Sequence, residues 1–286
     1  VRPLVHAARA ICAVAMLPAL LCWSRLATRW PASVSPCAPD APPFSMMPAG
    51  TKTIAGDAQL YRSCVYPFVL FLGCNLLLLV AESTMQWNHP EAAWWQQQPL
   101  LLIYPLQVLI CGAYLYYVRR DITWDWSLRA AALGALFGLV GIAIWLVPYV
   151  AGWIPAEGGF APEQVLGHGS AATSLAYAFR FARAVLIVPL VEELFWRGYM
   201  MRWCVNRDFP QSVPLGTHSW LGYGLTTLAF MLVHNPVDYA GAFVYGSLAY
   251  ALVVLTRRIT PAFVMHAVAN LVMGLCAVYC QLPHLW

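Results

Sequence analysis

Long apolar runs recur along most of this chain, separated by short stretches of polar residues, glycine and proline. A helix needs about 20 apolar residues to cross the hydrocarbon core of a bilayer, and most of these runs have that length. The pattern predicts an all-α fold, a polytopic membrane helix bundle of about seven transmembrane helices. The seven runs are 63–81, 100–118, 130–150, 171–203, 220–233, 237–256 and 261–280.

The beginning of the chain has a different pattern. The apolar run 11–22 follows Arg2 and Arg9 and has the length of a signal-peptide core. It is short for a membrane span, although it could equally form an eighth helix. Six prolines lie between residues 31 and 48, which predicts a Pro-rich, partly disordered linker.

These features divide the chain in two. We expect residues 1–62 to be an N-terminal extension and residues 63–286 to form the transmembrane bundle. Because Met46 and Met47 stand shortly before the first convincing span, we also expect the working protein to start near Met46. N-terminal sequencing of the purified protein tests this expectation.

Composition narrows the choice of partners. The chain is 61% hydrophobic and 10% charged, against roughly 25% charged residues in a soluble domain. The net charge is only +4, and the basic residues form no extended stripe, so we expect a lipid bilayer as partner and no nucleic acid. The nine cysteines form no CxxC pair, which excludes a zinc ribbon as the organising feature.

Arginine positions predict the orientation in the membrane. Arg119, Arg120 and Arg129 cluster after the second span, whereas residues 82–99 and 151–170 contain no Arg or Lys. Short cytoplasmic loops carry the excess of positive charge. We therefore expect a multi-pass protein of the cell (inner) membrane whose first span starts on the cytoplasmic side and whose C-terminus is external.

The fourth run, 171–203, contains the charged residues that are candidates for catalysis. Glu193 and Arg197 stand four residues apart and can pair on one helix face, whereas Glu192 points about 100° away. A carboxylate that is desolvated without a partner becomes a stronger base, as a general base requires. The alternative is a helix end at the cytoplasmic interface, where both acids are simply solvated.

Two histidines stand on other apolar runs. His234 follows Phe230 by one helical turn, and His266 lies six residues into its run with Asn270 one turn later. Polar side chains inside a membrane helix need partners or a wet cavity. The alternatives are an interfacial position for His234 and a purely structural hydrogen bond for His266.

The order of these residues resembles a known family. Glu192, Glu193 and Arg197 match EExxxR, Phe230 and His234 match FxxxH, and His266 and Asn270 match HxxxN. This constellation is similar to the CPBP family, which comprises the type II CAAX prenyl proteases and their bacterial relatives, also called Abi proteins. The resemblance covers a core of about residues 173–275. The run VEELFWRGYM also resembles the CAAX prenyl protease-related proteins found beside exosortase protein-sorting systems.

The resemblance implies an intramembrane endopeptidase that acts on a membrane-associated protein or peptide. Carried over by motif, Glu192 and His234 would activate a water, while His266 and Asn270 would stabilise the oxyanion. Glu193 and Arg197 would be structural, beside Phe230 of the second motif. The family leans towards a mechanism without a cofactor, yet His234, His266 and a Glu could also bind zinc.

Two other functions remain open at this stage. A member of the family could act without proteolysis, as a membrane scaffold or an immunity-type protein. A proton-coupled transporter is less favoured, because only one span is richly charged and no inverted repeat is visible.

The shared site makes a geometric demand on the fifth run. If 220–233 were part of a straight, full-length span, His234 and His266 would lie roughly 20 Å apart in depth. The run is short and is followed by HNPVD, so we predict that this helix ends inside the protein, with irregular backbone lining a cavity. Asp238 would then be the residue that could orient His234.

Overall fold

The computed structural model describes residues 58–154, 158–280 and 282–285. The expected run 11–22, the linker 31–48 and the start near Met46 lie outside these residues. The described chain is helical, as predicted, and has six helices of membrane-spanning length and hydropathy plus one shorter apolar helix. The spanning helices cover Ala58–Thr84, Leu100–Val118, Leu128–Val150, Ala171–Trp203, Pro236–Thr256 and Thr260–Tyr279.

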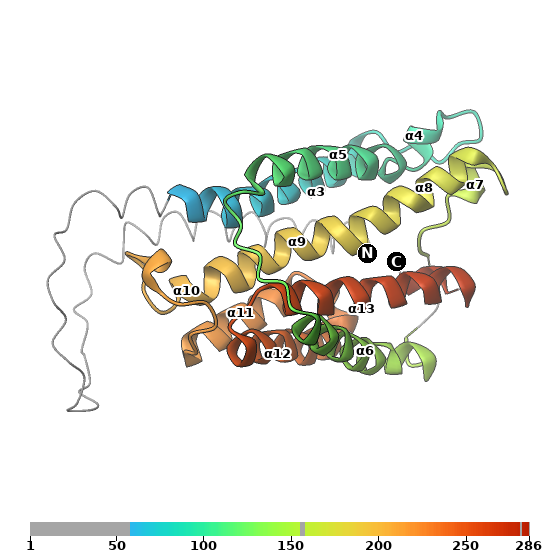
Figure 1. Cartoon of the computed structure of the whole chain (residues 1–286). Coiled ribbons are helices and arrows are strands. Elements are labelled where there is room, and N and C mark those ends of the chain that lie inside the picture. The colour runs from blue at the N-terminus through green and yellow to red at the C-terminus, as the bar shows by residue number, and fades with distance from the viewer. Residues whose placement is uncertain (1–57, 155–157, 281, 286) are drawn as a thin grey trace, which may run out of the picture.

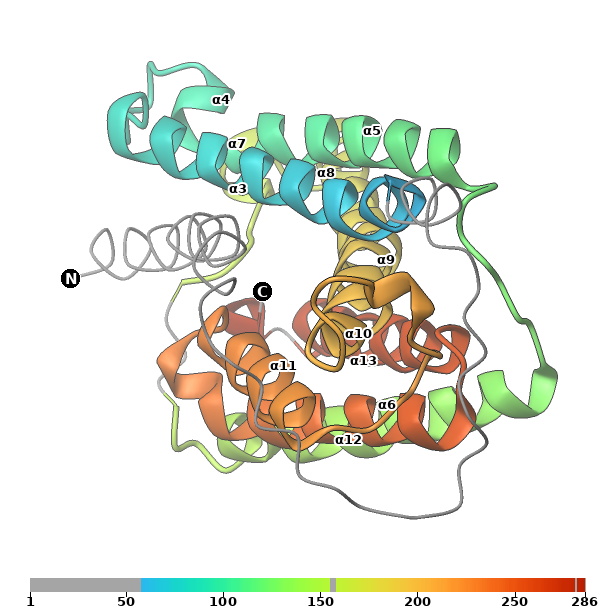
Figure 2. The ribbon, with the colours of Figure 1, turned by 90° about the vertical axis from the view of Figure 1, so that its left-hand side faces the viewer.

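The helices form layers about one long central helix. Helices α3 (Tyr66–Thr84) and α5 (Leu100–Val118) lie on one side of it, and α6 (Leu128–Val150), α11 (Trp220–Leu232), α12 (Tyr239–Thr256) and α13 (Thr260–Tyr279) lie on the other (Figure 1). The end-on view shows the central helix between the two groups (Figure 2). Side chains of the central helix can therefore reach both layers.

The central helix is continuous but not uniform. It consists of α8 (Ala171–Ala182), the π-helical turn η3 (Arg183–Ile187), α9 (Val188–Glu193), the π-helical segment η4 (Leu194–Met200) and α10 (Met201–Trp203). A π-helix forms i→i+5 hydrogen bonds and is frequent at functional sites. Here the two wide segments flank the six residues that end in the Glu192–Glu193 pair.

The shorter helix ends where the sequence predicted. α11 ends at Leu232, and the 3₁₀ turn η6 (Pro236–Asp238) leads directly into α12. Two antiparallel helices thus meet at a short connection that contains His234. Pro236 fits this connection because it stands at the first position of the turn, where no N–H is needed.

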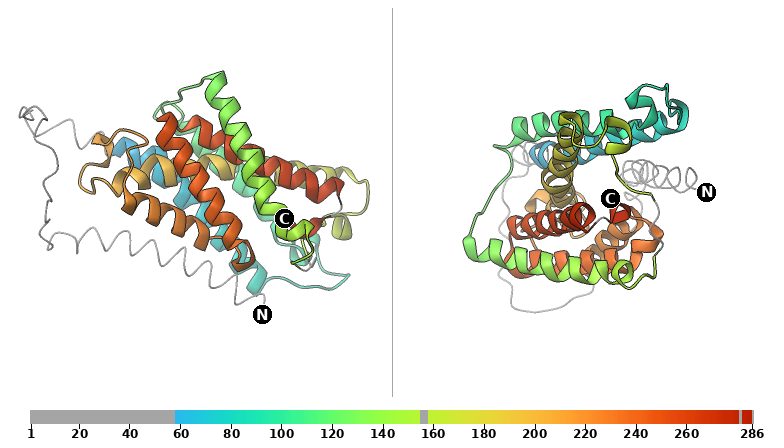
Figure 3. Two further views of the ribbon diagram at one scale, coloured as in Figure 1. Left: turned by 90° about the horizontal axis from the view of Figure 1, so that it is seen from below. Right: turned by 90° about the vertical axis from the view of Figure 1, so that its right-hand side faces the viewer.

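Helices α6 and α13 approach closely through glycine. A Cβ built on Gly138 would lie 2.5 Å from the carbonyl oxygen of Met265, closer than any side chain tolerates. Gly134 meets the backbone of Pro261 in the same way, one turn earlier. Small residues allow membrane helices to pack backbone to backbone. This contact fixes the position of α13, which carries His266, against α6 (Figure 3).

Two ion pairs link loop segments at one end of the bundle. Arg62 pairs with Asp121 at 2.8 Å, and Arg258 pairs with Asp125 at 3.0 Å. These ion pairs join the start of the first span, the loop between α5 and α6, and the turn between α12 and α13. At the other end, the short helices α4 (Trp94–Gln97) and α7 (Glu163–Leu166) contact each other.

Candidate active site

Glu193 is the centre of a buried ionic cluster. Its side chain is 1% exposed, and its Oε1 accepts hydrogen bonds from Arg197 Nη1 at 3.2 Å and from His266 Nδ1 at 2.9 Å. The pair with Arg197 was predicted from the four-residue spacing. The bond to His266 was not, because it joins residues 73 positions apart.

Arg197 is held from several directions. Its guanidinium lies over the Phe230 ring, 5.0 Å from the centroid, and its Nη2 donates to the carbonyl oxygen of Gly246 at 3.4 Å. A buried charge is tolerated when it is paired and hydrogen-bonded. Phe230, from the FxxxH motif, therefore contacts the EExxxR motif directly, and α11, α12 and α13 are tied to the central helix around one cluster.

The hydrogen bonds of the two histidines define their tautomers. A carboxylate and a carbonyl oxygen can only accept, so the ring nitrogen facing either oxygen must carry the proton. His266 therefore donates from Nδ1 to Glu193, and His234 donates from Nδ1 to the carbonyl oxygen of Phe230 at 2.7 Å. In each neutral ring, Nε2 is then the acceptor nitrogen.

Asn270 connects α13 to the π-helical turn η3. Its Nδ2 donates to the carbonyl oxygen of Ala184 at 2.7 Å. Because the wide turn alters the backbone hydrogen-bonding pattern, a carbonyl of the central helix is left to a side chain of another helix. One N–H of the Asn270 amide is thereby engaged in holding the two helices together.

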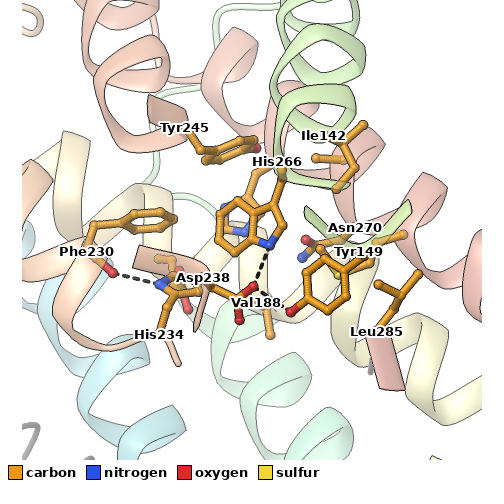
Figure 4. A pocket seen from close by; sticks show the side chains of 14 residues that line it. Ile142, Tyr149, Val188, Phe230, His234, Asp238, Tyr245, His266, Asn270 and Leu285 are labelled. Atoms are coloured by element: carbon orange, nitrogen blue, oxygen red, sulfur yellow. Dashed lines mark hydrogen bonds between the residues drawn. The ribbon is translucent and has the colours of Figure 1, made fainter. Parts of the chain in front are cut away.

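Glu192, His234, His266 and Asn270 line one cavity of about 210 Å³ between the central helix and the layer that contains α6 and α13. Figure 4 labels His234, His266 and Asn270 among the lining residues. The structure thus brings together the four residues that sequence analysis singled out for chemistry. Glu193, Arg197 and Phe230 lie in or beside its wall. The complete lining is Ile142, Trp145, Tyr149, Val188, Glu192, Phe230, His234, Asp238, Tyr245, His266, Ala269, Asn270, Met273 and Leu285.

One wall of the cavity is built around Asp238. Its Oδ1 accepts hydrogen bonds from Trp145 Nε1 at 3.0 Å and from Tyr149 OH at 2.7 Å (Figure 4). Trp145 in turn packs edge-on against His234, with ring centroids 5.2 Å apart. The sequence suggested Asp238 as the residue that orients His234, and the structure connects the two through the indole of Trp145.

Three aromatic residues of the lining were not singled out from the sequence. Trp145, Tyr149 and Tyr245 belong to long apolar runs in which aromatic residues are frequent. Each of them places an indole N–H or a phenol hydroxyl inside a predicted span, and such a buried group usually needs a hydrogen-bond partner. This is the sequence feature from which they could have been identified.

The alternative of a zinc site requires a suitable set of ligands, and none is present in the described part of the chain. Residues 58–154, 158–280 and 282–285 contain no group of three or more His, Cys, Asp or Glu side chains placed to hold a metal ion. The carboxylate nearest to His266 is instead shared with Arg197.

The described part of the chain is a polytopic helix bundle that encloses a cavity lined by one glutamate, two histidines and an asparagine. Residues 174–272 match the family model described as type II CAAX prenyl endopeptidase Rce1-like. Over this region the chain is therefore similar to the type II CAAX prenyl endopeptidases, a family of membrane proteases. Neither the curated proteins nor the solved structures gave a match.

Proposed function

We propose that this protein is an intramembrane endopeptidase that hydrolyses a peptide bond near the membrane surface of a membrane-associated protein. The observation that carries the proposal is the convergence of Glu192, His234, His266 and Asn270 on one cavity from the central helix, the connection between α11 and α12, and α13. The family match supports a CAAX-type substrate, in which the cysteine near the C-terminus carries a prenyl group.

The proposed reaction begins with a water held between Glu192 and His234. Its oxygen forms a bond to the peptide carbonyl carbon, its proton passes to Glu192, and the carbonyl π electrons move onto the oxygen. The His234 tautomer suits this step, because Nε2 accepts a hydrogen bond from the water while Nδ1 is fixed by Phe230.

Collapse of the tetrahedral intermediate completes the hydrolysis. The carbonyl reforms, the C–N bond breaks, and its electron pair leaves with the nitrogen, which takes the proton from Glu192. The products are a carboxylic acid and an amine. Before this collapse, the second N–H of Asn270 would stabilise the negative oxygen, and His266 would do so when its Nε2 also carries a proton.

We assign Glu193 a positioning role. The His266 ring can rotate only if it gives up the 2.9 Å bond to Glu193, so its Nε2 edge is directed by the ionic cluster. A supporting carboxylate that sets the orientation and tautomer of a histidine is a recurrent arrangement in enzymes.

The test compares cells that contain the wild-type protein, Glu192→Ala or His234→Ala. We expect membrane peptides that are produced in wild-type cells to be missing in both variants. Identical peptide profiles would contradict the protease function and favour a non-proteolytic scaffold or immunity-type role. Wild-type cleavage retained after exhaustive chelation would exclude the zinc-dependent version.

We also propose an orientation with the arginine-rich end of the bundle in the cytoplasm. Arg62 and Arg258 form their ion pairs with the same loop, 119–127, which is the loop expected to be cytoplasmic. With this orientation the C-terminus is external and the protein is a multi-pass inner-membrane protein. The association with an exosortase-type system stays a prediction from the VEELFWRGYM run.

A further inference from the structure

Tyr245 has a buried hydroxyl group that finds no partner in the described part of the chain. The residue is 3% exposed on α12, and its hydroxyl has no hydrogen-bond partner among the described residues. The ring is fixed firmly, because it lies in contact with Gly141 and is stacked on Phe230 at a centroid distance of 6.0 Å. A phenylalanine would fill the same space without leaving a polar group unsatisfied.

Tyr245 belongs to the wall of the proposed active site. Tyr245 lines the same cavity as Glu192 and Asn270, and its ring centroid is 5.8 Å from that of His266. Figure 4 shows Tyr245 beside His266 at one wall of the cavity. The hydroxyl interacts electrostatically with Glu193, Arg197 and Glu192, the three charged residues of the EExxxR motif.

The oxyanion site needs a donor of this kind. His266 uses its Nδ1 proton on Glu193, so a neutral His266 presents only the acceptor Nε2 to the cavity. Asn270 has already given one N–H to Ala184. A phenol is a neutral donor, and it can serve a negative oxygen whatever the protonation state of the imidazole.

We propose that Tyr245 is a catalytic residue whose hydroxyl donates a hydrogen bond to the substrate carbonyl oxygen as that oxygen becomes negatively charged. This inference rests on the proposed function and extends it by one donor. The hydroxyl lacks a partner among the described residues because its partner is the transition state. The site thereby accepts a less stable fold in exchange for activity.

The experiment uses the full-length protein reconstituted in liposomes, with an internally quenched peptide that ends in a farnesylated CAAX sequence. Tyr245→Phe is expected to lower kcat by about 100-fold, the usual order for loss of one oxyanion donor, with little change in KM. Its melting temperature should equal or exceed that of the wild type, since the variant removes an unsatisfied buried hydroxyl.

The matched control is Tyr250→Phe, five residues further along the same helix. The Tyr250 hydroxyl bonds the backbone N–H and carbonyl of Ser219 and the Nδ1 of His218, all remote from the cavity. This variant should lower the melting temperature and leave kcat near the wild-type value. The two tyrosines thus predict opposite patterns from the same chemical change.

The outcomes separate the two proposals. If Glu192→Gln is inactive while Tyr245→Phe keeps wild-type kcat, the role of Tyr245 is wrong and the protease function stands. If the wild type fails to cleave the peptide, or if Glu192→Gln cleaves it normally, the proposed function falls and the role of Tyr245 falls with it. A Tyr245→Phe protein with a lowered melting temperature would show that the hydroxyl is structural.

Discussion

At the scale of single residues, two adjacent glutamates have different surroundings. Glu192 lines the cavity, whereas Glu193 is enclosed by Arg197 and His266. Helical spacing predicted that the two carboxylates diverge and that Glu193 pairs with Arg197. Spacing along one helix could not predict the bond to His266, which depends on how α13 packs against the central helix.

Isosteric substitutions at these neighbours should have different effects. Glu193→Gln removes the negative charge between Arg197 and His266, and breaking a buried ion pair of this kind costs about 3–5 kcal/mol of stability. We expect Glu193→Gln to lower both the melting temperature and kcat. Thermal unfolding in detergent and cleavage of the quenched peptide measure the two effects.

Glu192→Gln is the control for this experiment, because it makes the same atomic change one residue away. It should abolish cleavage and leave the melting temperature almost unchanged. A Glu193→Gln protein that unfolds at the wild-type temperature would contradict the claim that the ionic cluster stabilises the fold.

At the scale of elements, the helices that form the site were predicted with uneven success. The short fifth helix could be predicted, since its apolar run is too brief to span and the residues HNPVD follow it. The π-helical segments at Arg183–Ile187 and Leu194–Met200 could not, because hydrophobic periodicity does not distinguish a wide turn from an α-helical one within a uniformly apolar run. The hydrogen bond from Asn270 to the carbonyl oxygen of Ala184 could not be predicted either, because it depends on the π-helical turn at Arg183–Ile187.

The contact between α6 and α13 yields a prediction about the position of His266. Gly138→Ala places a methyl group against the carbonyl oxygen of Met265, the residue before His266, and should force the helices apart. Overpacking of this type costs typically about 1–3 kcal/mol. We expect a lower melting temperature together with reduced kcat, as His266 moves away from the cavity.

Gly224→Ala in α11 is the matched substitution, because nothing lies within 4 Å of a Cβ at that position. It should leave activity unchanged and stability equal or slightly increased. Equal melting temperatures for the Gly138 and Gly224 variants would show that the close approach of α6 and α13 is not tightly constrained.

At the scale of the whole molecule, two arginine ion pairs lie at one end of the bundle. Sequence analysis predicted that the loop after the second span is cytoplasmic, and Arg62 and Arg258 both form ion pairs with this loop, through Asp121 and Asp125. An epitope inserted between residues 121 and 127 should bind antibody only after permeabilisation of spheroplasts. An epitope inserted between residues 86 and 93 should bind antibody in intact ones, and the reverse pattern would overturn the proposed orientation.

The size of the cavity has a consequence for selectivity. A polypeptide in α-helical form is about 10–12 Å across with its side chains, whereas a space of about 210 Å³ accommodates little more than the residues beside one peptide bond. If the protein is the protease proposed above, its target would enter as an extended strand with its internal hydrogen bonds already broken. An unstructured juxtamembrane segment would then be cleaved, whereas the same sequence in a stable α-helix would be resistant. Selectivity would thus depend on the conformation of the target before any of its side chains is recognised.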